Sequence, residues 1–205
     1  MMYFYNFNTA FMNSTILITF VLLFTTPFFF AQEENEHESF FTETEWNSEF
    51  FEFPINFARE IPLQGIEEAV FPPGWGKTER PEFWSYLFLW KVKTTAPLTE
   101  EALEMYLQYY FDGLLDINNR KNGTTILPTT ALLKNTSPTN FIGAIHLFEG
   151  RYTQKMLYLH TLISQKYCEN TQEAILVFKF SPKGLNDPIW QKFDHIKLKD
   201  EICPD

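Results

Sequence analysis

The segment from Trp84 to Val92 constrains the fold of this chain more than any other. Large side chains alternate along one of its faces, and they are Trp84, Tyr86, Phe88, Trp90 and Val92. The opposite face carries Leu87 and Leu89. A strand that is apolar on both faces fits the centre of a sheet, because its two sides must both be covered. We therefore expect a central strand here, covered over most of each face.

Period-two patterns continue through the second half of the chain, at residues 124–133, 140–148, 151–163 and 173–180. Turn sequences at 149–150 and 169–171 join neighbouring segments, which is typical of antiparallel strands. A further short strand is predicted at 50–57, where Pro54 confines it to a sheet edge or to its own end. Residues 60–82 are rich in proline and glycine and are predicted to form a loop.

Two helices are expected among these strands. The longer one covers 100–117, where Thr99 can cap its start and acidic residues occupy its first turn. Asp187-Pro188 opens a shorter helix that has its own apolar stripe. The order of elements predicts a single α+β domain over 50–205, with one long and one short helix packed on an antiparallel β-sheet.

The first part of the chain is predicted to lie outside this domain. Residues 1–31 contain no Asp, Glu, Lys or Arg, and Thr15 to Ala31 is almost entirely apolar. Such a stretch is typical of a secretory signal peptide, here cut after Ala31, with Met1 or Met12 as the start. The alternative is an uncleaved anchor, since about 17 apolar residues lie near the lower limit for spanning a bilayer. We expect an exported protein, periplasmic or secreted, that meets the membrane only through this segment.

Acidic residues are concentrated directly after this segment. Eight carboxylates and no Lys or Arg lie there: Glu33, Glu34, Glu36, Glu38, Glu43, Glu45, Glu49 and Glu52. Such a run favours a flexible, solvated leader over 32–49, with a calcium or cationic-partner site as the alternative. The whole chain has 16 Lys and Arg against 26 Asp and Glu, a formal net charge of −10. This charge argues against nucleic-acid binding.

Residues with catalytic or metal-binding chemistry are few. The histidines are His37, His146, His160 and His195. His146 and His160 fall on segments that can be neighbouring strands, and with Glu149 they would resemble a metal or hydrolytic site. No histidine spacing fixes such a geometry, and the sequence contains no nucleophile-elbow or phosphate-binding motif. The pattern therefore predicts no catalytic residue, no metal and no cofactor.

Cys168 and Cys203 are the two cysteines of the chain. In an oxidising compartment an isolated pair most simply forms one disulfide, whereas in a reducing compartment both would be free thiols. The disulfide would tie the C-terminal tail to the end of a strand. Its loop of 203 − 168 = 35 residues would contribute on the order of 3–4 kcal/mol through lost chain entropy.

The loop around Phe71-Pro72-Pro73-Gly74-Trp75 is the candidate ligand-binding surface, with Arg80 on its polar rim. A rigid loop that holds an aromatic ring outward loses little entropy on binding, and a tryptophan face suits sugars, proline-rich peptides or cations. In the alternative arrangement, Phe71 and Trp75 fold inward and plug the edge of the sheet.

The order of elements from Phe71 to Leu198, together with the Pro73-Gly74-Trp75 turn, resembles the PsbP-like family, named for an extrinsic subunit of photosystem II. In that family a strand and a P-x-G-W turn precede a long helix, antiparallel strands and a short closing helix. The segment 71–90, which reads "FPPGW…EFWSYLFLW", is also similar to an uncharacterised family of exported bacterial proteins. These resemblances imply an α/β sandwich outside the cytoplasm and carry over no catalytic residue.

The resulting hypothesis is a non-enzymatic exported domain that binds an envelope protein, or a glycan or peptide ligand, through the 71–75 loop and the adjoining sheet. The alternative is a secreted hydrolase with His146 or His160 as general base and Glu149 as its partner. A third interpretation is a purely structural element of a larger assembly.

Overall fold

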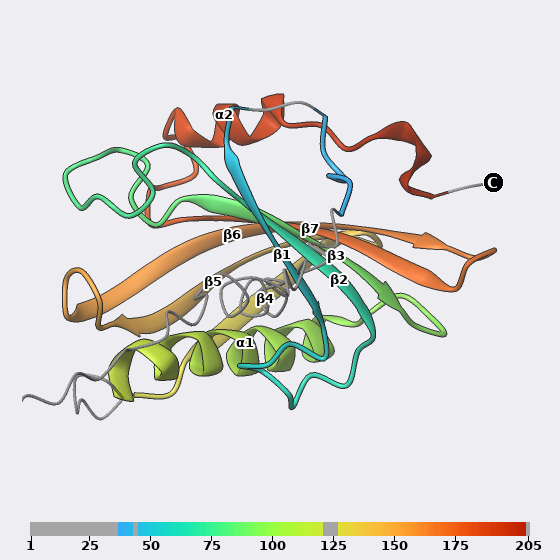
Figure 1. Ribbon diagram of the computed structural model, residues 1–205, viewed down its shortest axis with the longest axis horizontal. Helices are drawn as coiled ribbons and strands as arrows, with labels where there is room; N and C mark the ends of the chain where they lie inside the picture. The colour runs from blue at the N-terminus through green and yellow to red at the C-terminus, as the bar shows by residue number, and fades with distance from the viewer. Residues whose placement is uncertain (1–36, 43–44, 121–126, 204–205) are drawn as a thin grey trace, which may run out of the picture. The chain divides into compact units, whose positions relative to one another are not determined.

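The computed structural model describes residues 37–42, 45–120 and 127–203. Its seven strands are β1 (Asn47–Phe53), β2 (Gly65–Phe71), β3 (Tyr86–Lys93), β4 (Thr130–Ser137), β5 (Asn140–Glu149), β6 (Lys155–Cys168) and β7 (Glu173–Ser181). They form one sheet in the order β1-β2-β3-β7-β6-β5-β4, and each neighbouring pair is antiparallel (Figure 1). The helices are α1 (Glu100–Arg120) and α2 (Ile189–His195), followed by a 3-10 turn (Asp200–Ile202). The predicted single α+β domain is confirmed.

Strand β3 lies near the middle of the sheet, between β2 and β7, as its apolar faces predict. On one face, Phe88 and Trp90 pack against Phe178 with ring centroids 4.6 and 4.7 Å apart, and α1 covers this layer. On the other face, Leu87 and Leu89 belong to a second core with α2. Figure 1 shows the two helices on opposite sides of the sheet. None of the helices in the described residues has the length and apolar character needed to cross a membrane.

The loop predicted for 60–82 is wrong in its first half, because β2 lies there and joins β1 to β3. Its sequence contains Glu67 and Glu68, which are both buried. A buried strand ordinarily carries apolar residues, so the two adjacent carboxylates interrupted the apolar pattern by which this strand could have been predicted. Strand β1 also begins three residues before the predicted strand and ends at Phe53, directly before Pro54. This agrees with Pro54 ending an edge strand.

Strand β4 lies later than the predicted 124–133 strand, because it begins at Thr130, and residues 124–126 lie outside the described residues. The predicted signal peptide and both candidate starts lie outside them too. The acidic leader is ordered in part. Phe41 forms an isolated antiparallel bridge with Leu198, and the Thr42 backbone N–H donates to the Lys197 carbonyl at 2.8 Å.

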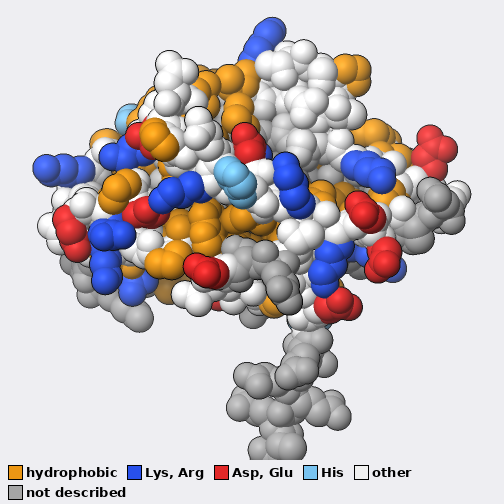
Figure 2. Space-filling model, turned by 90° about the horizontal axis from the view of Figure 1, so that it is seen from above, with side chains coloured by type: hydrophobic (Ala, Val, Ile, Leu, Met, Phe, Trp, Pro, Cys, Tyr) orange, Lys and Arg blue, Asp and Glu red, His pale blue; other side chains and the backbone are white. Residues whose placement is uncertain are grey.

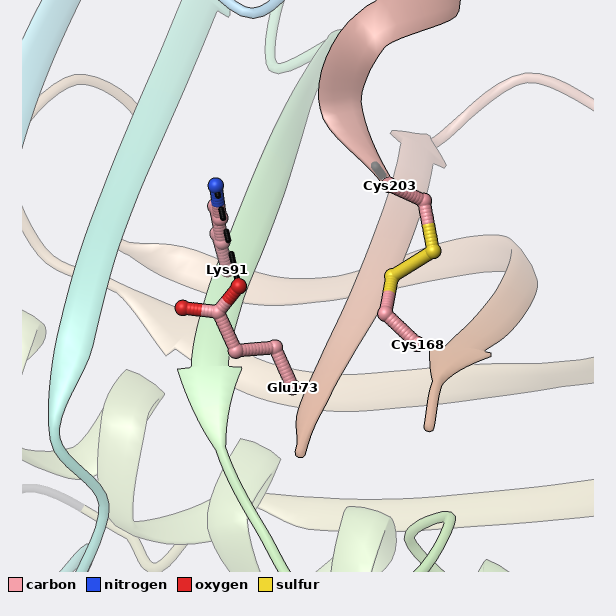
Figure 3. The surroundings of a disulfide bond; sticks show 4 residues. All are labelled: Lys91, Cys168, Glu173 and Cys203. Carbon is pink, nitrogen blue, oxygen red and sulfur yellow. Dashed lines mark ion pairs between the residues drawn. A yellow bond between two sulfur atoms is a disulfide. The ribbon is translucent and has the colours of Figure 1, made fainter. Parts of the chain in front are cut away.

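The predicted disulfide is present between Cys168, at the end of β6, and Cys203, after the 3-10 turn (Figure 3). Beside it, Lys91 Nζ lies 3.7 Å from Glu173 Oε2, linking β3 to β7. The disulfide fixes the C-terminal tail against the sheet. The tail in turn pairs with residues 40–42. We call residues 39–42 and 197–203 together the terminal clasp.

Candidate functional site

An aromatic cavity of about 420 Å³ opens on the α1 face of the sheet. It lies between β1, the end of β2, the loop 72–76, the start of β3, the second half of α1 and the turn after β5. Seven aromatic side chains line it: Phe51, Phe71, Trp75, Trp84, Tyr86, Tyr110 and Tyr152. Its volume and mainly apolar wall are those of small-molecule sites in proteins.

The loop 72–76 is folded by its own backbone. The Trp75 N–H donates to the Pro72 carbonyl at 3.1 Å, and Gly74 adopts a φ of +97°, which glycine tolerates without strain. The Trp84 N–H then donates to the Trp75 carbonyl at 3.0 Å. Trp84 itself has a φ of +52°, which is rare for a bulky residue. Strained backbone of this kind concentrates at binding sites and switch regions.

Trp75 folds inward. Its ring is partly buried and lies 5.0 Å from Phe71, 6.0 Å from Trp84 and 6.2 Å from Tyr152, centroid to centroid. Of the two arrangements considered from the sequence, the structure has the inward one, yet Phe71 and Trp75 line a cavity and leave part of it open. Trp75 therefore contributes to the core as well as to the cavity wall.

Arg80 does not line the cavity. Its side chain is exposed, packs beside Gly74, and places Nε 3.7 Å from Glu82 Oε2. Glu82 also accepts a hydrogen bond from Lys192 Nζ at 2.8 Å. Arg80 thus lies beside the loop and not in the cavity wall.

Three polar atoms of cavity-lining residues are buried without a hydrogen-bond partner in the described part of the chain: Trp75 Nε1, Trp84 Nε1 and Tyr86 Oη. Trp84 and Tyr86 are 4% and 2% exposed. Leaving a buried donor unpaired costs about 1–3 kcal/mol, so native proteins rarely do so without a reason. Burial and the nearby Glu67 carboxyl raise the pKa of Tyr86 well above its ordinary value, so its hydroxyl stays protonated.

Glu149 shapes the side of the cavity that lies after β5. Its buried carboxylate accepts the backbone N–H groups of Arg151, Tyr152 and Thr153 at 2.6–3.0 Å, and the Thr153 hydroxyl at 2.9 Å. These bonds hold the turn that brings Arg151 and Tyr152 to the cavity wall. The guanidinium carbon of Arg151 lies 5.0 Å from the centre of the Tyr152 ring. Glu149 is fully engaged in positioning this turn.

Glu67 lies behind the cavity wall, fully buried on β2. It accepts hydrogen bonds from Trp90 Nε1 and Tyr110 Oη, each at 2.7 Å, and Tyr110 lines the cavity. Burial raises the pKa of the Glu67 carboxyl to about 8, although these two hydrogen bonds act to lower it. The carboxyl is therefore mainly protonated and neutral at pH 7.

Comparison with protein-family models, with curated proteins and with solved structures finds no match to this chain. Function is therefore inferred from the residues of the site alone.

The histidines lie away from this cavity. His146 pairs in register with Tyr158, whose ring centroid lies 5.2 Å from that of His160. By strand alternation both histidines face away from α1, whereas Glu149 faces α1. The structure thus does not bring Glu149 together with either histidine. Viewed from the side that carries α2, exposed hydrophobic side chains lie among basic, acidic and histidine side chains (Figure 2).

Within the described residues no group of three or more His, Cys, Asp or Glu side chains is placed to hold a metal ion. The sequence analysis found two of the cavity residues, Phe71 and Trp75, through their proline- and glycine-rich loop. It missed the roles of Trp84, Tyr86 and Tyr152. Trp84 and Tyr86 come soon after that loop and alternate in phase with Phe88, and this alternation was the available sequence signal. Tyr152 comes from a distant turn, so no local sequence pattern linked it to the cavity.

Proposed function

We propose that this protein is a non-enzymatic, exported binding domain that holds a small ligand in the aromatic cavity. The observation that carries the proposal is the cavity of about 420 Å³ with seven aromatic side chains in its wall. The apolar surface of a ligand in the cavity would pack against this aromatic wall.

Export is supported by two features. Residues 1–31 have the composition of a signal peptide, and Cys168 and Cys203 form a disulfide, which is typical of oxidising compartments. Mass spectrometry of the protein recovered after full-length expression tests this directly. A mature chain that begins at Gln32 is expected, and an intact N-terminus would count against export by cleavage.

A PsbP-like sandwich is our proposal for the fold family. It is supported by the order of elements after the Pro73-Gly74-Trp75 turn, in which β3 and the long helix α1 precede four antiparallel strands and the short helix α2. This resemblance concerns architecture, and the binding proposal does not depend on it.

The binding proposal is tested by thermal-shift screening of the full-length protein against cyclic small molecules, glycans and peptides. A ligand at 100 times its dissociation constant adds about 2.7 kcal/mol to the free energy of unfolding, a rise of roughly 5–10 °C at this size. Leu114→Trp, which fills the cavity wall, should abolish the shift. Leu132→Trp, at a residue 72% exposed on β4, is the control and should retain it. Silence across the whole panel would contradict the proposal.

A further inference from the structure

We propose that the face of β4, β5 and β6 that points away from α1 docks an amphipathic α-helix of a partner protein, whose apolar stripe is flanked by Asp or Glu. This face lies on the opposite side of the sheet from the aromatic cavity, so its role is independent of the proposed small-ligand function. Three properties of the face support the proposal: its uncovered apolar side chains, its charge, and the way in which α2 covers the neighbouring strands.

Part of this face is covered by neither hydrophobic core. Alternate residues of β4, β5 and β6 point toward α1 and form the core beneath it. Within the described residues, the second core, under α2, takes no buried residue from β4 or β5. Six apolar residues that point away from α1 belong to neither core, and we call them the open strip: Leu132, Ile142, Ala144, Phe148, Met156 and Tyr158. Leu132, Tyr158 and Met156 are 72%, 53% and 39% exposed. Exposed hydrophobic residues are ordinary when they are scattered, whereas a contiguous group marks an interaction surface.

The strand register makes the open strip contiguous. Leu132 lies beside Ala144 across the β4–β5 pair, and Phe148 lies beside Met156 across the β5–β6 pair. The Cβ atoms of residues paired in this way are about 5 Å apart. From Ile142 to Phe148 the strip extends about 20 Å along β5, which is the length of roughly 14 helical residues. A hollow of about 370 Å³ beside Ile142 has room for one larger side chain of the partner.

The charged groups on this face are basic. The three strands contain one carboxylate, Glu149, and it faces α1. Lys134 and Lys166 point away from α1 and are exposed, and neither forms an ion pair with another described residue. His146 and His160 add ring N–H donors to the same face. In a chain with a net charge of −10, this local excess of basic groups favours a partner that carries carboxylates beside its apolar residues.

Helix α2 already covers the neighbouring strands in the way proposed for the partner. Its apolar side is buried on the sheet, and its Asp194 Oδ1 lies 2.7 Å from Lys179 Nζ on β7. One row of the register crosses β7, β6, β5 and β4 through Lys179, Leu162, Ile142 and Lys134. A carboxylate of α2 therefore pairs with the lysine at one end of this row, and the lysine at the other end is available to a partner. A second helix of the same composition, lying beside α2, would continue the helical layer over the open strip.

Two helical peptides test this preference. Each has roughly 20 residues, which is long enough to be helical in isolation, and both carry the same leucine stripe. The stripe is flanked by glutamate in one peptide and by lysine in the other. Fluorescence anisotropy with the full-length protein should show the glutamate peptide binding at least about tenfold more tightly, because several exposed charge pairs each contribute a small factor. The net charge of −10 favours the opposite order, so this preference can come only from a local basic surface.

Variants at exposed positions assign the binding to the open strip. Leu132→Glu places a carboxylate in the strip and should weaken the glutamate peptide about tenfold. Lys134→Glu should bring the affinities of the two peptides within about twofold of each other. Lys155→Glu is the matched control, because Lys155 is exposed on β6 but pairs in register with Glu149 and so lies on the α1 side. Exposed substitutions of this kind change stability little, so each variant is expected to fold.

Several outcomes would overturn the proposal. They are equal binding of both peptides, preference for the lysine peptide, binding of neither, and a glutamate preference that survives both Leu132→Glu and Lys134→Glu. Sedimentation with phosphatidylglycerol vesicles that Leu132→Glu abolishes, without peptide binding, would assign the strip to a membrane surface instead. A dimer in light scattering that Leu132→Glu dissociates would assign it to a second copy of the chain. None of these results changes the thermal shift produced by a ligand of the aromatic cavity, so the proposed function is tested separately.

Discussion

Glu67 shows how one residue sets a property of the whole fold. Its carboxyl group titrates near pH 4.5 when unfolded, and burial raises its pKa to about 8 in the folded protein. Between these values the folded state holds one more proton than the unfolded state. The Glu67 contribution to the free energy of unfolding therefore falls as pH rises through this window, by on the order of 5 kcal/mol in all, and levels off above it.

We expect Glu67→Gln to remove this pH dependence. The amide oxygen can accept from Trp90 Nε1 and the amide N–H₂ can donate to Tyr110 Oη, so the variant imitates the protonated acid. Urea unfolding from pH 4.5 to 9 should show the variant gaining stability over the native chain as pH rises. Glu60→Gln, at an exposed position, is the control. Parallel curves for Glu67→Gln and the native chain would show that Glu67 is not titrating as inferred.

At this scale the sequence predicts some functional residues and not others. Phe71 and Trp75 could be singled out because prolines and glycines around them mark a rigid loop. Glu67 could not be singled out, because two adjacent glutamates are ordinarily exposed to solvent. Its hydrogen-bond donors, Trp90 and Tyr110, which compensate for its burial, lie 23 and 43 residues away in the sequence. Contacts between distant residues leave no local pattern.

Among the elements, the pairing of α1 with the edge strand β4 was also invisible in the sequence. From the sequence, the glutamates at the start of α1 are interpreted as negative charges that the helix dipole stabilises. In the structure, Glu104 Oε1 accepts the Leu133 N–H at 2.7 Å and Glu100 Oε2 accepts the Asn135 N–H at 2.6 Å. About two turns after Glu104, Asp112 Oδ1 accepts the Thr129 N–H at 2.7 Å. Carboxylates of α1 thus occupy backbone groups that an edge strand would otherwise present to another chain.

Removing these acceptors should weaken the protein and expose the edge. Glu104→Ala leaves the half-buried Leu133 N–H unpaired and should lower the free energy of unfolding by about 1–2 kcal/mol. Adding Glu100→Ala should promote self-association through β4, seen by light scattering. Glu104→Gln keeps an acceptor oxygen and is the matched control. If the Ala and Gln variants were equally stable and equally monomeric, the carboxylates would have no protective role.

Strands and helices with a clear period were predicted well, since β3, α1, β5 and β7 lie at or near their expected positions, whereas β6 begins four residues and ends five residues later than the predicted strand 151–163. The failure at β2 has a definite cause. One of its two adjacent glutamates, Glu67, is turned toward α1 and bonded to Trp90 and Tyr110, and the other, Glu68, accepts from the Ser39 hydroxyl and the Phe40 N–H, each at 2.6 Å. Each carboxylate is satisfied by partners outside its own strand, which no periodicity can reveal.

For the whole molecule, the terminal clasp is the feature that joins the ends of the described chain. Residues 39–42 are held from one side by Glu68 and from the other by the C-terminal tail, where the Lys199 N–H donates to the Phe40 carbonyl at 2.9 Å. The tail is fixed in turn by the disulfide to β6. The clasp packs with α2, on the opposite side of the sheet from the aromatic cavity.

This separation predicts that stability and binding can be uncoupled. Replacing Cys168 and Cys203 by Ala frees the tail and should lower the free energy of unfolding by on the order of 3–4 kcal/mol, the chain-entropy value for a 35-residue loop. In hydrogen exchange, the Thr42 and Lys199 amides should lose protection first, because both bond across the clasp. The affinity for a ligand found in the thermal-shift screen should stay within about twofold of the native value at temperatures where the variant is folded, because additivity holds for distant sites. A large loss of affinity, or loss of protection that starts in β3, would instead show that the clasp supports the cavity through the sheet.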